Sequence, residues 1–326
     1  MVPHHARPAG GAEGRMWTVP LDAVFGPLRD KQAIPAGTPD AGVVGLCGAA
    51  PIPGHLDLSP GPEFGTPLAF EPGMVSALEG ALSRPGGIGG PVVLGLDTDP
   101  YQPVERTLRL TRAVLEVLER FGHPVAIVTR CVGVAGDLDL LRRLASRGLV
   151  RVWVAVATLD PALARVVEPR AAAPARRWQA VAALSAAGVP VGVLAAPMIP
   201  GLNDAEMERI LEAAARAGAR RAGYALLRPS PETQDGLAVW LRQHFPERAR
   251  HVLALVREHC AAALAEERRT RHAFSGPVTY PDALAQRFAR ATRRLGLHAH
   301  EALDFDRPAP PARAEAPTRE MQPSAS

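Results

Sequence analysis

The sequence predicts an α/β fold, a partial TIM-like barrel made of six βα units. At five places an apolar run gives way to polar residues and then to a helical pattern. A strand buried in a parallel sheet is apolar on both faces, so it is seen as a continuous apolar run. Right-handed helical crossovers would then curl such strands into a barrel. The five runs are 92–96, 125–128, 150–156, 191–196 and 224–227.

A helix is expected after each of these strands, because apolar residues recur there with helical spacing. The expected helices are 104–121, 137–147, 174–187, 204–217 and 235–263. A strand at 42–46 and a helix at 72–84 would supply the sixth unit. One more helix, 281–295, ends before Gly296 and is expected to lie on the outside of the barrel.

The bulk properties favour one globular domain without a membrane segment. The chain has 326 residues, of which 47% are hydrophobic, and three cysteines that form no disulfide framework. We expect the barrel with its C-terminal helices over 17–300, and disordered segments at 1–16 and 301–326. With neither a long apolar window nor an apolar stretch behind the first basic residues, the expected location is the cytoplasm.

Arginine supplies nearly all of the positive charge, since Lys31 is the single lysine and the net charge is +4. Such a mild charge does not by itself indicate nucleic acid. Four arginines flank one strand-end loop, and they form either a patch facing phosphate or carboxylate groups or a solvated helix face. Glu168 in the same loop forms either a salt bridge with its neighbour or a ligand contact. The four arginines are Arg165, Arg170, Arg176 and Arg177.

Polar residues at the carboxyl ends of the strands are the candidate site, because barrels of this class bind ligands there. Asp97, Thr98 and Asp99 follow the 92–96 strand, and they could bind a metal or ribose hydroxyls, or serve only to build a turn. Thr129 and Arg130 end the next strand. An arginine in that position can hold a carboxylate or phosphate through two hydrogen bonds.

Several common enzyme classes find no support. The sequence contains no GxSxG elbow, no HExxH zinc motif and no Walker A loop. Cys131 is expected to be a structural thiol near the barrel mouth, and His259 with Cys260 is expected to pack on a helix rather than bind metal. No catalytic residue is assigned.

Five segments between residues 55 and 204 resemble the radical SAM superfamily, in the branch similar to spore photoproduct lyase that is often labelled DNA repair photolyase. The resemblance extends over about two thirds of the chain, from 55 to 256. It implies a partial (βα)6 barrel, S-adenosylmethionine (SAM) as cofactor, a [4Fe–4S] cluster and a lyase-like radical reaction. The segments are HLDLSPGPEF at 55–64, LGLDTDPYQPVE at 94–105, HPVAIVTR at 123–130, TLDPALARVVEPRAAAPARR at 158–177 and PVGVLAAPMIPGLND at 190–204.

The same resemblance implies which residues line the SAM site. They are the polar residues that follow the strands 92–96 and 125–128, together with residues at the ends of the strands 150–156 and 191–196. Arg130 stands where the family has a lysine, and the two side chains are not equivalent donors. The implied cofactor-binding residues are Asp97, Thr98, Asp99, Thr129, Arg130, Thr158, Pro197 and Met198.

The cluster motif is degenerate. Family members hold the [4Fe–4S] cluster through CxxxCxxC, and Cys47 aligns with its third cysteine as the metal ligand. Val44 and Asp40 occupy the positions of the other two cysteines. An iron–sulfur cluster needs thiolate ligands, and valine supplies none. Cys131 could supply a second thiolate only if the fold brings it beside Cys47, and a third ligand would still be needed.

Three functions stay open at this point. The first is a radical SAM enzyme that acts on nucleic acid or another macromolecule with an unusually assembled cluster. The second is a clusterless barrel that binds SAM or a nucleotide-like ligand as a regulatory or interaction protein. The third is an inactive relic. Residues 17–54 do not follow the sequence pattern of the family. This difference reflects either true divergence or a compensated frameshift, and the sequence does not distinguish the two.

Overall fold

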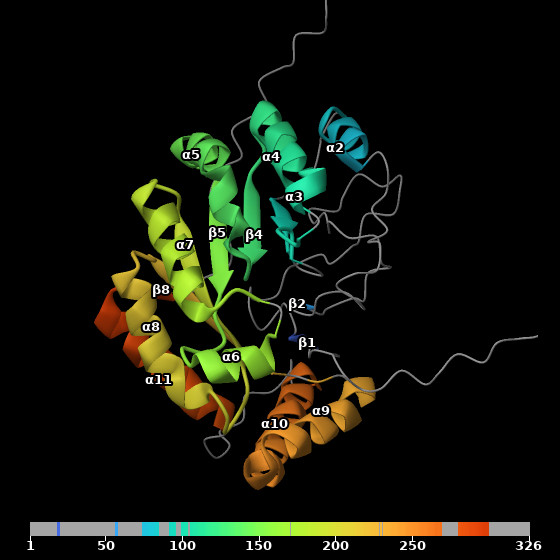
Figure 1. Cartoon of the computed structure of the whole chain (residues 1–326), viewed down its shortest axis with the longest axis vertical. Coiled ribbons are helices and arrows are strands. Elements are labelled where there is room, and N and C mark those ends of the chain that lie inside the picture. The colour runs from blue at the N-terminus through green and yellow to red at the C-terminus, as the bar shows by residue number, and fades with distance from the viewer. Residues whose placement is uncertain are drawn as a thin grey trace, which may run out of the picture.

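A computed structural model of the chain shows a curved sheet of six parallel strands (Figure 1). It describes residues 18–19, 56–57, 74–84, 91–95, 99–103, 105–169, 171–227, 229, 231–268 and 280–299. The strands pair in sequence order: β3 (Val92–Leu94), β4 (Val125–Thr129), β5 (Val150–Ala155), β6 (Val191–Met198), β7 (Arg221–Leu226) and β8 (His298–Ala299). The partial barrel expected from the sequence is confirmed.

Five of the six sheet strands are the ones predicted from apolar runs, β3 to β7. The sixth strand of this sheet, β8, pairs with β7 and was not predicted, because two residues are too few to show a period. The strand expected at 42–46 lies outside the described residues, as do the segments 1–16 and 301–326. A separate antiparallel pair is formed by β1 (Thr18–Val19) and β2 (Leu56–Asp57).

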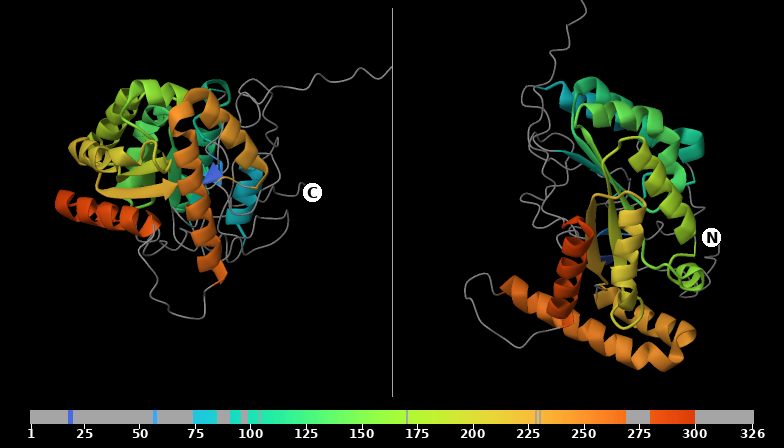
Figure 2. Two further views of the ribbon diagram at one scale, coloured as in Figure 1. Left: turned by 90° about the horizontal axis from the view of Figure 1, so that it is seen from below. Right: turned by 90° about the vertical axis from the view of Figure 1, so that its left-hand side faces the viewer.

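Helices cover the outer side of the curved sheet, as Figure 2 shows. The helix at the C-terminal end, α11, confirms the prediction for 281–295 and packs on α8 through an ion pair between Arg287 and Glu208. The covering helices are α2 (Met74–Leu82), α4 (Leu110–Phe121), α5 (Leu138–Ser146), α7 (Pro174–Ala186), α8 (Met207–Arg216) and α11 (Tyr280–Leu295). Short 3-10 helices, η1 (Val132–Asp137) and η2 (Asp204–Glu206), precede α5 and α8.

The single helix expected at 104–121 is wrong, because the chain breaks at Arg109. A four-residue helix, α3 (Glu105–Leu108), ends there, and Arg109 adopts a left-handed backbone with φ 47°. The carboxylate of Glu105 accepts hydrogen bonds from the amides of Leu110 and Arg112, at 3.0 and 3.2 Å. These amides begin α4 and have no partner within the helix, so Glu105 satisfies them and allows a new helix to start.

The helix expected at 235–263 is also two helices, α9 (Pro231–His244) and α10 (Pro246–Arg268). Pro246 explains the break, since proline lacks the amide proton and restricts the residue before it. A further helix, α6 (Pro161–Val167), was missed although its signal is present. Asp160 accepts from the Ala162 amide at 2.7 Å, and Pro161 occupies the first turn.

Two hydrophobic clusters hold the described part together. The larger lies between the sheet and the outer helices. The smaller joins the ends of β5, β6 and β7 to the α9–α10 hairpin, so the hairpin lies at the carboxyl edge of the sheet. The smaller cluster consists of Ala157, Val167, Ile199, Leu202, Leu227, Leu237, Leu241, Ala249, Val252 and Val256. Among the described helices, none combines the length and the apolar character that crossing a membrane requires.

Candidate functional site at the carboxyl edge of the sheet

Asp99 ties the loop after β3 to the end of β4. Its Oδ1 accepts from the Tyr101 amide at 2.9 Å and from the Thr129 hydroxyl at 2.7 Å, and its Oδ2 accepts from the Arg130 amide at 2.8 Å. Gly95, with φ 95°, permits the close approach that precedes this loop, because a Cβ there would collide with the Val128 carbonyl oxygen. Asp99, Thr129 and Arg130 therefore lie together at the carboxyl edge of the sheet, and their role in cofactor binding stays a prediction. Their hydrogen bonds join the loop after β3 to the end of β4 at the carboxyl edge of the sheet.

Thr158 is tied in a comparable way to η2, the 3-10 helix that follows β6. Its hydroxyl donates to Glu206 Oε1 at 2.6 Å, and the Leu159 amide donates to Glu206 Oε2 at 2.9 Å. The Thr158 hydroxyl also accepts from the Asp160 amide at 3.0 Å. Glu206 lies 48 residues further along the chain and fixes the loop after β5. Sequence reasoning did not connect these two residues, since nothing local pairs them.

Asn203 is the buried residue that joins the ends of β5 and β6. Its amide group donates to the carbonyls of Ala157 and Pro197 at 2.7 and 2.9 Å, and its Oδ1 accepts from the Ile199 amide at 2.6 Å. All three contacts are with backbone. Asn203 is fully buried, and its side chain forms hydrogen bonds with backbone groups that would otherwise lie unpaired where β6 leaves the sheet.

Arg130 belongs to a buried cluster of three charged residues whose contacts were not predicted from the sequence. We name Arg130, Glu168 and Arg177 the ArgGluArg cluster; at most 5% of each residue is exposed. Arg177 Nη2 lies 2.7 Å from Glu168 Oε2, and Arg130 Nη1 lies 3.8 Å from Glu168 Oε1. Arg177 also donates to the carbonyls of Ala172 and Ala155, at 2.8 and 2.9 Å. It therefore connects the start of α7 to the end of β5.

One side-chain atom of each residue in the ArgGluArg cluster is without a hydrogen-bond partner among the described residues. Arg130 Nη1, Glu168 Oε1 and Arg177 Nη2 are buried and have no hydrogen-bond partner within the described residues. Their ion pairs are electrostatic contacts without hydrogen-bond geometry. Buried polar atoms are nearly always hydrogen-bonded, so the cluster can accept a further polar group.

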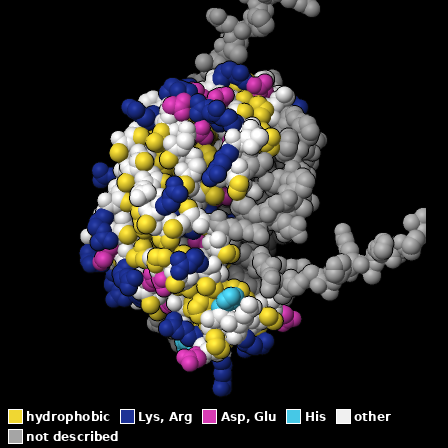
Figure 3. Space-filling model, viewed as in Figure 1, with side chains coloured by type: hydrophobic (Ala, Val, Ile, Leu, Met, Phe, Trp, Pro, Cys, Tyr) yellow, Lys and Arg dark blue, Asp and Glu magenta, His cyan; other side chains and the backbone are white. Residues whose placement is uncertain are grey.

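The four arginines around the loop after β5 do not form one common patch or one solvated face, because Arg177 is buried. It is 1% exposed, whereas Arg165 and Arg176 are exposed and Arg170 lies outside the described residues. Glu168 pairs with Arg130 and Arg177, which lie far from it in sequence or on the next helix. On the face drawn in Figure 3, Lys and Arg side chains are scattered among hydrophobic and acidic ones.

The remaining predicted site residues separate into two groups. Pro197 and Met198 are the last residues of β6 and are buried, with Met198 in the larger hydrophobic cluster. Asp97, Thr98 and Cys47 lie outside the described residues. A ligand-binding role for any of these residues stays a prediction.

The two described thiols lie apart in the packing. Cys131, directly after β4, packs on the larger cluster, and Cys260, in α10, packs on the smaller. Burial, together with the nearby Asp99 carboxylate, raises the pKa of the Cys131 thiol far above its usual range. Such a thiol is protonated at neutral pH. No group of three or more potential metal-binding side chains is found in the described part of the chain.

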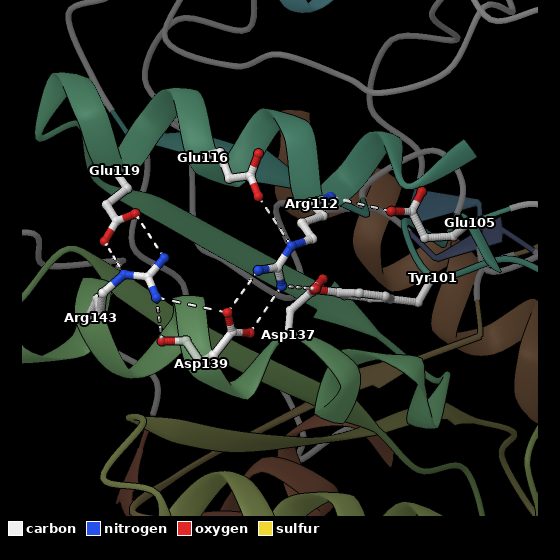
Figure 4. Close-up of polar contacts among 8 residues, drawn as sticks. All are labelled: Tyr101, Glu105, Arg112, Glu116, Glu119, Asp137, Asp139 and Arg143. Carbon is white, nitrogen blue, oxygen red and sulfur yellow. Dashed lines mark hydrogen bonds and ion pairs between the residues drawn. The ribbon is translucent and has the colours of Figure 1, made fainter. Parts of the chain in front are cut away.

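An ion-pair network outside the barrel supports the same edge (Figure 4). Tyr101, in the loop that carries Asp99, donates its hydroxyl to Asp137 Oδ2 at 3.1 Å. Asp137 Oδ1 accepts from Arg112 at 2.8 Å, and Arg112 also donates twice to Asp139, at 2.9 and 2.7 Å. Burial, followed by the Asp137 charge, raises the pKa of Tyr101 well above its usual value. The loop is thus held from the helices as well as from β4.

A comparison with protein families identifies the class of part of the chain. Residues 77–214, which run from α2 into α8 and include β3 to β6, match the family model of the radical SAM superfamily. This part of the chain is a radical SAM domain.

Relatives in other organisms are uncharacterized proteins. One from Mycobacterium tuberculosis is 32% identical over 203 residues, which are 62% of this chain and 60% of that protein. Another from Methanocaldococcus jannaschii is 26% identical over 119 residues, which are 36% of this chain and 44% of that protein. The match therefore spans less than two thirds of these relatives' own length.

Solved structures give weaker likenesses. A spore photoproduct lyase double mutant with bound AdoMet and dinucleoside spore photoproduct has a TM-score of 0.44 at 14% identity, covering 70% of this chain and 65% of that chain. Streptococcus suis SuiB bound to S-adenosylmethionine has a TM-score of 0.38 at 14% identity, covering 69% and 44%. Likenesses with TM-scores this low say nothing about function.

Proposed function

We propose that this protein binds SAM, or a nucleotide-like ligand with the same acidic end, at the carboxyl edge of its sheet, and that it does so without the standard [4Fe–4S] cluster. It would then act as a regulatory or interaction protein derived from the lyase-like branch that its motifs resemble. The runner-up is an enzyme of that branch with an unconventional cluster.

The observation that carries this proposal is the unused hydrogen-bonding capacity of Arg130. Its Nη1 is buried, has no hydrogen-bond partner among the described residues and lies 3.8 Å from the nearest carboxylate oxygen. A buried guanidinium with one open donor nitrogen is suited to a carboxylate, which accepts a charge-assisted hydrogen bond from it. SAM carries one carboxylate, at the end of its amino-acid part.

The donor set does not fit a [4Fe–4S] cluster. The whole sequence has three cysteines, and no two of them have CxxxCxxC spacing. Cys131 packs on the larger hydrophobic cluster and Cys260 on the smaller, so the two described thiols do not lie together. The cluster takes thiolate ligands, which the described residues do not bring together. Cys47 alone would keep one of three expected ligands.

Two measurements test this proposal. Thermal unfolding with increasing SAM should show stabilisation, about 2.7 kcal/mol when SAM reaches 100 times its Kd. An Arg130→Gln variant should lose most of this stabilisation, whereas Arg176→Gln, which changes an exposed arginine on α7, should keep it. Unchanged unfolding at every SAM concentration would contradict SAM binding.

Iron and acid-labile sulfide are measured after anaerobic reconstitution, with Cys47→Ala as the control. The expected result is no stoichiometric cluster in either protein. About four irons and four sulfides per chain in the wild type, lost in the control, would favour the runner-up enzyme instead.

Nucleic acid is the proposed macromolecular partner, and the cytoplasm is the proposed location. The motifs that resemble the DNA repair photolyase-labelled branch support the first of these, and the sequence pI of about 9.4 is compatible with it. Binding of a DNA duplex should then weaken steeply as salt is raised from about 50 to about 200 mM. Absence of binding at the lower salt concentration would contradict it.

A further inference from the structure

The short helix η2, between β6 and α8, contacts a different element on each of its two sides. Asp204 Oδ2 accepts a 2.5 Å hydrogen bond from the hydroxyl of Tyr280, the first residue of α11. Two residues later, Glu206 accepts from the Thr158 hydroxyl at 2.6 Å and from the Leu159 amide at 2.9 Å. η2 therefore lies between the C-terminal helix and the loop after β5, where the sequence predicts a SAM contact at Thr158.

The position of η2 depends on these side-chain contacts. None of its three residues is buried, so apolar packing does not fix it. A single 3-10 turn also has few hydrogen bonds of its own. Asn203 and Met207, the residues on either side of η2, are buried and fix its two ends. Between these ends, α11 holds η2 through Tyr280 and through Arg287, which donates to the Asp204 carbonyl at 3.1 Å.

We infer that Tyr280 is a positioning residue of the carboxyl edge: through Asp204 it holds η2 in the place from which Glu206 fixes the Thr158 loop. This inference deepens the proposed function and rests on it for one step, the participation of this loop in SAM binding. The C-terminal helix would then act on the site from the outer side of the sheet, without contacting the ligand.

The two contacts are broken together if η2 moves as a unit. Asp204 and Glu206 are two residues apart in one turn, which the Glu206 amide closes by donating to the Asn203 carbonyl at 2.9 Å. A movement of η2 that frees the Leu159 amide must then also break the Tyr280 contact. Without that hydrogen bond the movement should occur about tenfold more often. The alternative is a rotation of the Glu206 side chain alone, which Tyr280 would not affect.

Hydrogen exchange of the Leu159 amide, measured by NMR on the full chain without ligand, tests the inference. This amide donates to the Glu206 carboxylate, so its exchange rate reports on that contact. Tyr280→Phe keeps the ring and removes only the hydroxyl, and it should raise the exchange rate about tenfold. α11 stays attached in this variant, because Arg287 still donates to Glu208 at 2.8 and 2.6 Å.

Three further variants serve as controls. Asp204→Ala removes the acceptor of the same hydrogen bond and should match Tyr280→Phe. Asp204→Asn keeps an acceptor oxygen and should stay close to the wild type. Phe288→Leu weakens the packing of α11 elsewhere, since the Phe288 ring lies 4.8 Å from that of Tyr224 on β7. It should lower the overall stability but leave the exchange rate of Leu159 unchanged.

The outcomes separate the two proposals. An unchanged Leu159 exchange rate in a folded Tyr280→Phe protein, or an equal rise in Phe288→Leu, would overturn the positioning role and leave SAM binding untouched. SAM at about 100 times its Kd should slow the exchange of Leu159 in the wild type by up to about hundredfold, if the loop takes part in the site. If SAM does not change this rate but Tyr280→Phe raises it, the positioning role stands and the loop is not part of a SAM site.

Discussion

The hydroxyl of Tyr101 donates a 3.1 Å hydrogen bond to Asp137, a buried carboxylate at the end of η1. Tyr101 is two residues after Asp99, which is bound to the end of β4. Arg112, on α4, holds the other oxygen of Asp137 at 2.8 Å. The loop after β3 is therefore fixed between the sheet and the outer helices, and its position depends on groups that never reach the carboxyl edge.

The first prediction concerns this anchoring. Asp137→Ala should lower the free energy of unfolding by about 1–3 kcal/mol, because it leaves the buried Tyr101 hydroxyl without its acceptor and removes one partner of Arg112. Asp139→Ala, at an exposed position that also pairs with Arg112, should have a smaller effect. Urea unfolding of both variants checks this, and equal losses would show that Asp137 is no more important than a surface pair.

The second prediction concerns Asn203. Asn203→Asp keeps the shape but replaces the two donated hydrogen bonds by contacts between a carboxylate and the carbonyls of Ala157 and Pro197. The free energy of unfolding should fall by about 3 kcal/mol or more at pH 7, since a buried charge faces two acceptors. The loss should shrink as the pH is lowered and the new carboxyl is protonated.

The matched control for Asn203→Asp is Gln243→Glu, at an exposed position on α9. It makes the same chemical change, from a side-chain amide to a carboxylate, but at the surface. It should therefore alter the free energy of unfolding by no more than about 0.5 kcal/mol. If urea unfolding finds the two variants equally stable, Asn203 does not hold β5 and β6 together.

The third prediction concerns the Thr158–Glu206 pair. Thr158→Val removes the hydroxyl while keeping the branched shape, so Glu206 Oε1 loses its 2.6 Å donor. We expect a loss of about 1–3 kcal/mol in unfolding free energy. Thr158→Ser restores the hydroxyl and should recover most of it. A Thr158→Val protein as stable as the wild type would mean that the pair contributes nothing measurable.

The fourth prediction concerns Cys131, whose thiol pKa is raised mainly by burial. In a Cys47→Ala, Cys260→Ala background, Cys131 should react with a thiol reagent at about pH 8 far more slowly in the native protein than in urea. Rapid native reaction would contradict the neutral, buried thiol.

The same raised pKa has a consequence for stability. In the unfolded chain the thiol ionises near its ordinary pKa of about 8.5, whereas in the folded protein it stays protonated. The unfolded state thus loses the proton first, and the free energy of unfolding should fall as the pH rises above about 8.5. Cys131→Ala should flatten this part of the curve, measured by urea unfolding between about pH 7 and 10.

Local sequence patterns were enough to predict the sheet from β3 to β7 and the carboxyl-edge position of Asp99, Thr129 and Arg130. A continuous apolar run is a local signal of a buried parallel strand, and parallel strands bring their carboxyl ends to one edge. Local signals for the Pro246 break and the Asp160 cap were also present, although they were missed. The left-handed turn at Arg109 and the two-residue β8 had no comparable signal.

The partners of these residues, by contrast, depend on the folded arrangement of the chain. Glu206 reaches Thr158 across 48 residues, and Glu168 pairs with Arg130 and Arg177 rather than forming only a local pair. A buried polar group must find a partner, but that partner comes from whichever element the folded chain places beside it. Residue type therefore shows that a partner is needed, and the packing of β4, β5, α6 and α7 selects it.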